Sequence, residues 1–447
     1  MSQFKVLILS LTFFALSFST FAATLQSLID QTPEGGVLTL EDQIYEGSIV
    51  IKRTITIDGK GKATIDGGGV GSVITIKANG VILQNLNITN SGASHDKQDA
   101  GIKILKVSRV KILDNKIYET LTGVDMQESH DNEVTGNDIS SLSKTHIALR
   151  GDSIRVWASH RNIFRRNKIH DSRDMMIWYS NDNLIEENEA WNNRYALHFM
   201  YTGANTVRGN KYHHNQVGIF MMYGNSYTLE DNEISQAMGS TGICIGAKEV
   251  NKLILRRNKI VYCAVGLYLD QSPFDPQYFN LMQANVIAHN SVGLRFHSTL
   301  KNNIFKGNTF LENLETVSVQ ANGHALNNSF EGNYWHDFEG LDRDKNGIGD
   351  SNHEIKVYLD QLWDDNLWVR FYFASPVVSL LKFLAQLAPF TEPRLLIKET
   401  KPIMKADSPI LLSQENLFFE FPEYEDEDDE DDEDDEDDEE YIEGRHY

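Results

Sequence analysis

A short repeat that runs through most of this chain is the feature that most restricts its fold. Each copy carries a phrase of alternating apolar and polar residues that contains an asparagine, as in Asn162–Ile169 and Asn205–Asn210. A second phrase places a glycine before alternating apolar residues, as in Val217–Met222. The repeated asparagines follow one another at steps of 21 to 30 residues: Asn115, Asn137, Asn167, Asn188, Asn210, Asn232, Asn258, Asn285, Asn308 and Asn333.

Alternation with a period of two is typical of strands, and two or three short strands per copy fit one coil of a solenoid. The repeat therefore predicts an all-β fold, a right-handed parallel β-helix of about 11–12 coils, over residues 23–355. We expect the asparagines to occupy the corners, because asparagine tolerates left-handed backbone. Their side-chain amides can also hydrogen-bond from coil to coil. The segment Thr24–Asp30 is expected to cap the first coil.

The two ends of the chain have different compositions from the repeat. Residues 1–22 have the pattern of a signal peptide, with an apolar run at Val6–Phe18 followed by small residues. The protein is therefore expected to be exported to the periplasm or beyond. Residues 406–447 are expected to form a linker and a disordered tail, because Glu423–Glu440 holds 17 acidic residues and no basic one. The rest of the chain has 47 acidic and 41 basic residues, which argues against a nucleic-acid partner.

Residues 356–405 follow the repeat and are expected to cap the solenoid or to dock on a partner. Ser375 can cap a helix that has Pro376 at its first position. The apolar residues that follow have helical spacing. An amphipathic helix of this kind can pack on the last coil or bind another protein.

The outward face of the glycine phrase carries residues that could bind a soft metal. Strand alternation is expected to turn His198, Met200, Phe220 and Met222 outward, with Trp157, Ile177, Tyr179 and Cys244 in the same strip. Thioether and imidazole groups are a ligand set for Cu(I). Two interpretations stay open here, a copper or partner-binding strip and ordinary packing beneath loops. His213 and His214 lie just before this phrase and could contribute.

Three further patterns give expectations of their own. Cys244 and Cys263 are expected not to bridge, since the predicted register places them too far apart. Arg150, Arg173 and Arg194 form a column beside Asp152 and Asp174, which favours structural ion pairs over catalytic groups. A calcium loop is also predicted, because the oxygen-bearing residues have the appropriate spacing: Asp342, Asp344, Asn346, the Ile348 carbonyl and Asp350. The alternative for that loop is a set of Asx turns.

Four consecutive phrases resemble the NosD family, which comprises periplasmic β-helix proteins of nitrous oxide reductase maturation. They are Arg150–Ser159, Arg173–Ser180, Arg194–Thr202 and Asn215–Met222. The resemblance continues through Asn333–Trp335, Asp342–Asp350 and Ser375–Pro376, and it covers roughly residues 35 to 405. The chain departs from the family where Ser153, Met175 and Ala196 replace glycine, and in its acidic tail.

The resemblance implies a copper-delivery or maturation factor without catalysis of its own. It implies as partners an ABC transporter with ATPase and permease subunits, a copper chaperone lipoprotein and nitrous oxide reductase. Carried over, His198, Met200 and Met222 become candidate ligands of a transient Cu(I) site, with Met221 a weaker one. The alternative from the residues is a polysaccharide-binding or polysaccharide-cleaving β-helix, for which Asp152 and Asp174 are the acid pair to consider.

Overall fold

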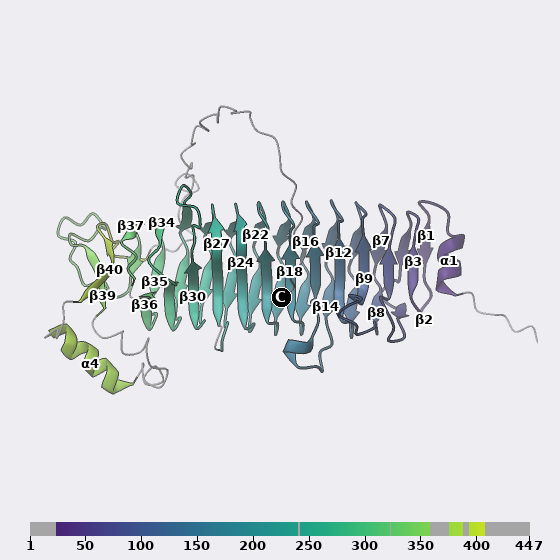
Figure 1. Ribbon diagram of the computed structural model, residues 1–447, viewed down its shortest axis with the longest axis horizontal. Coiled ribbons are helices and arrows are strands. Elements are labelled where there is room, and N and C mark those ends of the chain that lie inside the picture. The colour runs from purple at the N-terminus through teal and green to yellow at the C-terminus, as the bar shows by residue number, and fades with distance from the viewer. Residues whose placement is uncertain (1–23, 240–241, 322, 358–374, 388–392, 407–447) are drawn as a thin grey trace, which may run out of the picture. The chain divides into compact units, whose positions relative to one another are not determined.

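The computed structural model describes residues 24–239, 242–321, 323–357, 375–387 and 393–406 (Figure 1). Within them the chain forms a parallel β-helix of 13 coils, built from three sheets of 13, 13 and 12 strands. The prediction of a parallel β-helix is confirmed, and the coil count exceeds the predicted 11–12. The excess lies near the start of the repeat, where strands of three residues lack the asparagine marker. No helix of this part of the chain is long and apolar enough to cross a bilayer.

Each coil contributes one strand to each sheet in turn, and every strand pairs with those of the coils before and after it. Sheet A contains β1 (Val37–Thr39), β4 (Thr56–Asp58), β7 (Ile82–Gln84), β10 (Lys111–Leu113), β13 (Glu133–Thr135), β16 (Ile163–Arg165), β19 (Leu184–Glu186), β22 (Thr206–Arg208), β25 (Thr228–Glu230), β28 (Ile254–Arg256), β31 (Asn280–Gln283), β34 (Lys301–Lys306) and β37 (Asn327–Glu331).

Sheet B contains β2 (Ile44–Glu46), β5 (Thr64–Asp66), β8 (Asn87–Thr89), β11 (Lys116–Tyr118), β14 (Asp138–Ser140), β17 (Lys168–His170), β20 (Glu189–Trp191), β23 (Lys211–His213), β26 (Glu233–Ser235), β29 (Lys259–Val261), β32 (Val286–Ala288), β35 (Thr309–Leu311) and β38 (Tyr334–Trp335).

Sheet C contains β3 (Ile49–Ile51), β6 (Ile74–Ile76), β9 (Ala100–Leu105), β12 (Thr122–Gln127), β15 (Ile154–Trp157), β18 (Asp174–Trp178), β21 (Tyr195–Met200), β24 (Val217–Asn225), β27 (Ile243–Asn251), β30 (Val265–Asp270), β33 (Val292–Phe296) and β36 (Glu315–Val319). A single turn of 3₁₀ helix, Ile147–Leu149, interrupts the coil between β14 and β15.

The repeated asparagines form a buried ladder at one corner, between sheets A and B. Each side-chain oxygen accepts from the backbone N–H and the amide of the preceding rung, as Asn210 does for Asn188 at 2.9 and 3.0 Å. The left-handed residue at this corner is the one before each asparagine, for example Glu187 with φ 55°. The expectation that asparagine itself adopts the left-handed backbone is therefore wrong. The corner needs asparagine for the hydrogen bonds that its buried amide makes.

The glycine phrase lies in sheet C, where close approach between coils leaves little room for a side chain. A Cβ at Gly218 would lie 2.3 Å from the Cys244 carbonyl oxygen and 2.5 Å from an Ile234 methyl carbon. The apolar residues that follow point into the core, since Ile219 and Met221 have no exposed surface. The remaining outward positions of sheet C are therefore the ones free to carry a site.

Both ends of the described solenoid are capped. Helix α1 (Leu25–Gln31) lies at the first coil, where the Gln26 side chain exchanges two hydrogen bonds with the Val50 backbone of edge strand β3. This confirms the predicted opening cap. At the other end β39 (His353–Val357) pairs antiparallel with β40 (Arg394–Glu399). Burial raises the pKa of Glu399, whose carboxyl group accepts from the last ladder residue, Asn333, at 2.8 and 3.0 Å.

Residues 356–405 thus contribute a capping strand as well as helix α4 (Pro376–Leu387). The predicted signal peptide and the acidic tail lie outside the described residues.

Candidate functional site

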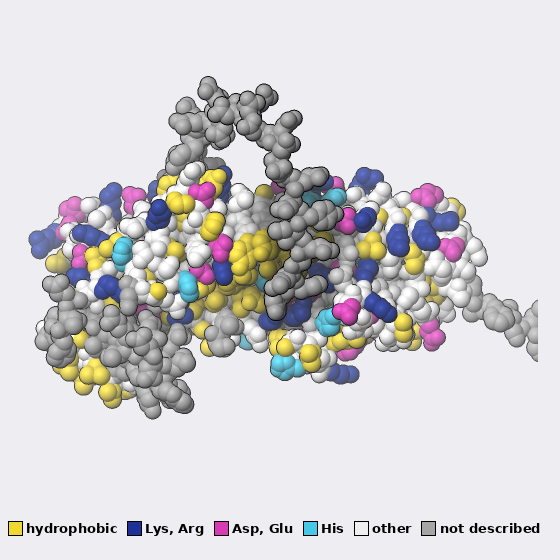
Figure 2. Space-filling model, in the orientation of Figure 1, with side chains coloured by type: hydrophobic (Ala, Val, Ile, Leu, Met, Phe, Trp, Pro, Cys, Tyr) yellow, Lys and Arg dark blue, Asp and Glu magenta, His cyan; other side chains and the backbone are white. Residues whose placement is uncertain are grey.

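The middle of sheet C carries two outward rows of residues from three adjacent coils. Met176, His198 and Phe220 form one row, from strands β18, β21 and β24. The second row, which lies beside it, is Trp178, Met200 and Met222. We call these six residues the His/Met strip. Figure 2 shows hydrophobic side chains gathered over the part of the molecule that Figure 1 labels β18 to β24.

The strip brings an imidazole and a thioether together across two coils. His198 Nε2 lies 3.5 Å from Met222 Sδ. A nitrogen donor about 2.0 Å and a sulfur donor about 2.3 Å from one tetrahedral ion would lie about 3.5 Å apart. Met200 is the direct neighbour of Met222 in the next coil, where successive strands are about 4.8 Å apart. The donors present therefore fit a soft monovalent ion such as Cu(I).

The structure brings His198, Met200 and Met222 to one face but not Met221. Met221 pairs with Phe199 in the core and has no exposed surface. This placement follows from strand alternation, because residues 221 and 222 must point to opposite faces.

Two expected members of the strip are placed differently. Ile177 is fully buried, and its neighbours Met176 and Trp178 point outward instead. The register shifts between β18 and β21, where Asp174 pairs with Tyr195 but Met176 pairs with His198. One extra residue in β21 therefore reverses the expected alternation in β18. Tyr179 lies beyond the strand, at a left-handed corner with φ 49°.

The other ring nitrogen of His198 faces a buried carboxylate. His198 Nδ1 lies 3.9 Å from Asp174 Oδ2 and has no hydrogen-bond partner. Arg194 Nε donates to Asp174 Oδ1 at 2.8 Å, and Arg194 Nη2 also donates to this carboxylate. Burial acts to raise the pKa of Asp174, but His198 and Arg194 outweigh it and hold the pKa below 3.8. The imidazole thus lies between a thioether and an ionised carboxylate, the usual outer partner of a metal-bound histidine.

Aromatic rings flank the strip. Tyr195 stacks on His198 with ring centroids 4.5 Å apart, and burial raises the pKa of Tyr195. Along the adjacent corner, Tyr179, Tyr201 and Tyr223 form a stack with centroid separations of 5.1 and 5.0 Å. Trp157 packs edge-on against Tyr179 at 5.1 Å. These rings restrict the side chains around the strip.

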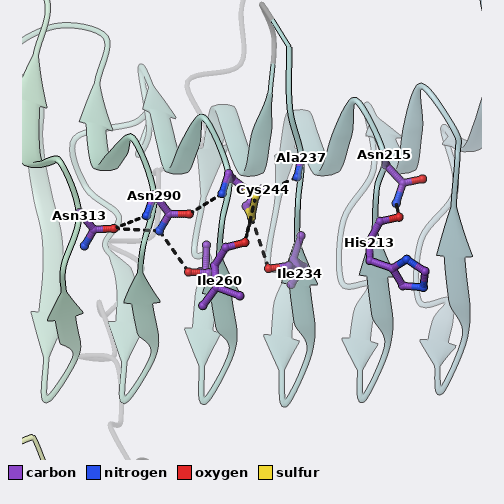
Figure 3. The surroundings of a disulfide bond; sticks show 10 residues. His213, Asn215, Ile234, Ala237, Cys244, Ile260, Asn290 and Asn313 are labelled. Carbon is purple, nitrogen blue, oxygen red and sulfur yellow. Dashed lines mark hydrogen bonds between the residues drawn. A yellow bond between two sulfur atoms is a disulfide. The ribbon is translucent and has the colours of Figure 1, made fainter. Parts of the chain in front are cut away.

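The two cysteines form a disulfide, which contradicts the expectation that they stay apart (Figure 3). Their Cα atoms are 5.8 Å apart. The expected register paired Cys244 with Tyr268, but Ile243 pairs with Val265 and Ile245 with Leu267. Cys263 is then only a few residues away, at the preceding corner. Both cysteines are buried, so Cys244 is not an outward ligand of the strip.

Cys263 replaces an asparagine in a second ladder, at the corner between sheets B and C. Its backbone N–H donates to Asn290 Oδ1 at 2.9 Å, as asparagines do in this ladder. The Ala237 N–H in turn lies 3.2 Å from Cys263 Sγ. Figure 3 shows Asn313, Asn290, the disulfide, Ala237 and Asn215 following one another along this corner.

The arginine column forms ion pairs between coils, as the structural interpretation predicts. Arg173 donates to Asp152 at 3.1 and 3.4 Å, and Arg194 pairs with Asp174. Both carboxylates are almost entirely buried. Burial raises the pKa of Asp152.

The predicted calcium loop is exposed, and its side chains bond within the loop. Asp342 accepts from the backbone N–H groups of Asn346 and Gly347 at 3.1 and 2.9 Å, and these bonds lower its pKa. Asp350 accepts from the Arg343 N–H at 2.7 Å. Across the described part of the chain, no three His, Cys, Asp or Glu side chains gather as a metal site.

The sequence reasoning missed Met176, Trp178 and the role of Asp174 as the neighbour of His198. The register shift that exposes the first two has no sequence marker. Asp174 was assigned to the arginine column alone, although the phrase Arg194–His198 places an arginine and a histidine on the coil that follows it.

The three parallel sheets define a class, the parallel β-helix proteins. Among solved structures, the A-module of mannuronan C-5 epimerase AlgE6 of Azotobacter vinelandii matches with a TM-score of 0.57. It is 13% identical, and the match covers 69% of this chain and 93% of the module. The AlgE4 A-module of the same organism gives 0.52 at 13% identity, over 69% and 94%. At such identities the likeness concerns the fold alone.

The sequence comparisons identify the family. Residues 140–340 match the family model described as periplasmic copper-binding protein (NosD). A "probable ABC transporter binding protein NosD" of Pseudomonas aeruginosa is 26% identical over 397 residues, covering 81% of this chain and 86% of the relative. Its counterpart in Stutzerimonas stutzeri is 24% identical over 390 residues, covering 83% and 87%. The chain is thus distantly related to the NosD proteins, and the region matched by the family model contains the whole His/Met strip.

Proposed function

We propose that this chain is a periplasmic accessory protein for copper-site assembly in nitrous oxide reductase, and that it carries Cu(I) as cargo on the His/Met strip. The observation that carries the proposal is the 3.5 Å approach of His198 Nε2 to Met222 Sδ on adjacent coils. Few ligands suit transient transfer, because a partner's donors can complete the coordination as the ion passes. His198 is largely buried, and the half-buried Met200 and Met222 are the ligands a partner would reach first.

The contacts of the strip favour a carrier over an enzyme. Asp152 and Asp174, the acid pair of the polysaccharide alternative, are buried and bound by Arg173 and Arg194. The tyrosines at the adjacent corner stack on one another, so the faces that would stack on a sugar ring are occupied. The imidazole and thioether groups of the His/Met strip therefore remain as the candidate binding groups.

The proposed partners are an ABC transporter, with its ATPase and permease subunits, a copper chaperone lipoprotein and the reductase. Both relatives are described as probable ABC transporter binding proteins, which supports a transporter partner. A periplasmic setting agrees with the family description and with a disulfide, since disulfides persist in oxidising compartments. Helix α4 offers the transporter six exposed apolar side chains: Val377, Leu380, Leu381, Phe383, Leu384 and Leu387.

Cu(I) titration of the full-length mature protein against a competing chelator tests the proposal. We expect saturable binding of one ion, and at least tenfold weaker binding by a Met200→Leu/Met222→Leu variant, which keeps the apolar volume and removes both sulfurs. Met238→Leu is the matched control, because Met238 is exposed but lies outside the strip. Equal Cu(I) affinity in the wild type and in the double variant would disprove the strip as the site.

A further inference from the structure

A second pair of ligand-type side chains lies at the corner that follows strand β23. His213 ends this strand of sheet B, and His214 has left-handed backbone with φ 54°. Adjacent side chains of a strand normally point to opposite faces, but a left-handed residue breaks that alternation. As a result the Nδ1 atoms of His213 and His214 face each other at 3.0 Å.

The surroundings of His213 fix its ring in the orientation of a metal ligand. Its Nε2 lies 3.2 Å from Glu189 Oε1, on the neighbouring strand β20. A proton on Nε2 that donates to this carboxylate leaves the lone pair of Nδ1 directed at His214. Trp191 stacks on the His213 ring with an interplanar angle of 2° and a centroid separation of 6.0 Å. A carboxylate on the far nitrogen is the usual outer partner of a metal-bound histidine.

An open pocket of about 540 Å³ borders His214. Its lining includes His214, Gln216, Gln236, Met238 and Tyr262. In the described residues no third histidine, cysteine or carboxylate joins the two imidazoles. An ion held here keeps open coordination positions, which is typical of exchange sites and not of closed structural ones.

We propose that His213 and His214 form a binding site for a divalent first-row transition-metal ion, with Glu189 as its outer carboxylate. Two nitrogens about 2.0 Å from one ion lie about 2.8 Å apart in square-planar and about 3.3 Å apart in tetrahedral geometry, which brackets the observed 3.0 Å. Binding needs both lone pairs, so the hydrogen shared by the two Nδ1 atoms moves to His214 Nε2. Among such ions Cu(II) is expected to bind most tightly.

This inference does not depend on the function proposed for the His/Met strip. Imidazole pairs suit divalent ions, whereas thioethers suit Cu(I). The residues also differ in place, because His213 and His214 lie at the end of β23 in sheet B, whereas the strip lies on sheet C. Either site can therefore be lost without the other.

Titration of the full-length mature protein with Cu(II) in the absence of reductant, followed by electron paramagnetic resonance, tests the site. We expect the wild type to show a bound ion with hyperfine splitting from two nitrogens. A His213→Gln/His214→Gln variant should lose this signal and bind at least tenfold more weakly. An unchanged spectrum and affinity in this variant would overturn the proposal. The acidic tail is identical in all variants, so its binding forms a common background.

The chain offers a matched control in His130 and His160, a second histidine pair with stacked rings 5.2 Å apart. Their Nδ1 atoms accept backbone N–H groups at 3.1 and 3.0 Å, and so cannot also bind a metal. His130→Gln/His160→Gln and His198→Gln should both keep the Cu(II) signal. Loss of the signal in either variant, with an unchanged unfolding midpoint, would also contradict the assignment.

A Glu189→Gln variant tests whether Glu189 orients the His213 ring or only attracts the metal ion through its negative charge. We expect about tenfold weaker Cu(II) binding, because a neutral amide stabilises the metal-bound imidazole less than a carboxylate does. The splitting from two nitrogens should be retained, because the amide can still accept a hydrogen bond from His213 Nε2. Glu233→Gln, at the equivalent place two coils further along sheet B, serves as the charge-matched control. Equal losses in the two variants would mean that Glu189 acts only through its charge.

Discussion

Two histidine-bearing regions of this β-helix bring pairs of donor atoms together by different means. In the His/Met strip an imidazole meets a thioether from the next coil, at 3.5 Å. At the corner after β23 two imidazoles meet within one coil, at 3.0 Å. Each region also has a carboxylate beside a ring nitrogen, namely Asp174 for His198 and Glu189 for His213.

The difference between them shows what the solenoid fixes and what it leaves free. Stacking sets the distance between equivalent positions of neighbouring coils, whatever residues stand there. The residue types then decide whether the donors are soft or borderline, and hence the metal. The pair at His213 and His214 depends instead on the left-handed backbone of His214, and not on stacking between coils.

The largest expected effect tests whether the His/Met strip depends on the disulfide between Cys244 and Cys263. Replacing both cysteines, Cys244→Ser/Cys263→Ser, should lower the free energy of unfolding by about 3 kcal/mol, since the bond closes a loop of 19 residues. Guanidinium unfolding measures this loss, with the reduced wild type as control. Cu(I) affinity of the strip should remain unchanged under native conditions. A joint loss of stability and Cu(I) affinity would show that the disulfide also shapes the strip.

The second prediction converts one region into the other. Met222→His should place a second imidazole near His198 and reverse the preference of the strip, with Cu(I) binding at least tenfold weaker and Cu(II) binding at least tenfold tighter. Paired titrations with the two oxidation states measure the reversal. Val70→His, at an exposed position outside both regions, is the control for an added histidine elsewhere. An unaltered preference would mean that residue type does not decide the metal at this place.

The third prediction concerns the outer carboxylate of the strip. Asp174→Asn should weaken Cu(I) binding by about tenfold, because the amide stabilises the bound imidazole less than the ionised carboxylate does. Competitive titration measures the change. Asp152→Asn is the control, since Asp152 pairs with Arg173 one coil earlier. Equal effects of the two substitutions would assign the loss to weakened packing.

Asp174 should also leave a pH signature. Its pKa is lowered in the folded protein, so its ionised form adds stability above its ordinary pKa of 3.8. This contribution disappears as the pH falls through the lower folded value. The stability difference between the wild type and Asp174→Asn, measured by denaturant unfolding, should therefore be constant at neutral pH and shrink below about pH 4. A difference that grows toward low pH would contradict this sign.

The smallest expected effect concerns the aromatic corner beside the strip. Tyr201 stacks between Tyr179 and Tyr223, and Tyr201→Ala should cost about 1 kcal/mol of unfolding free energy. Both metal affinities should stay within twofold of the wild type, because the tyrosine rings supply no donor to either site. Tyr118→Ala, outside this stack, gives the comparison. A strong loss of Cu(I) binding would instead make the stack part of the site.

Much of the fold could be predicted from the sequence, because a solenoid repeats one local rule. The asparagine spacing marks the coils from Asn115 to Asn333, and alternation correctly turns His198 and Met222 outward and Ile219 inward. The first coils lacked this marker, which is why the predicted number of coils was too low. The expectation that the asparagine has left-handed backbone is wrong. At each corner the residue before the asparagine adopts that backbone, and the asparagine supplies the side-chain hydrogen bonds.

Where the register between coils is irregular, sequence reasoning failed. One extra residue in β21 turns Met176 and Trp178 to the outer side of sheet C, where Met176 is still only 8% exposed, and turns Ile177 into the core. A shift of two residues in the expected pairing of β27 hid the disulfide between Cys244 and Cys263. Such shifts leave the local pattern intact, since alternation has the same period on either side of them.

The sequence by itself determined the repeat, the β-helix and the donor types in both proposed metal sites, because these depend on residue identity and on a period of two. Only the tertiary structure decided which donors meet. The approach of His198 to Met222, of His213 to His214 and of Cys244 to Cys263 depends on how successive coils align and on where the backbone turns left-handed. The alignment of neighbouring coils is set by the packing of whole coils. Each residue contributes only a small part of that packing energy, so the alignment cannot be read from single residues.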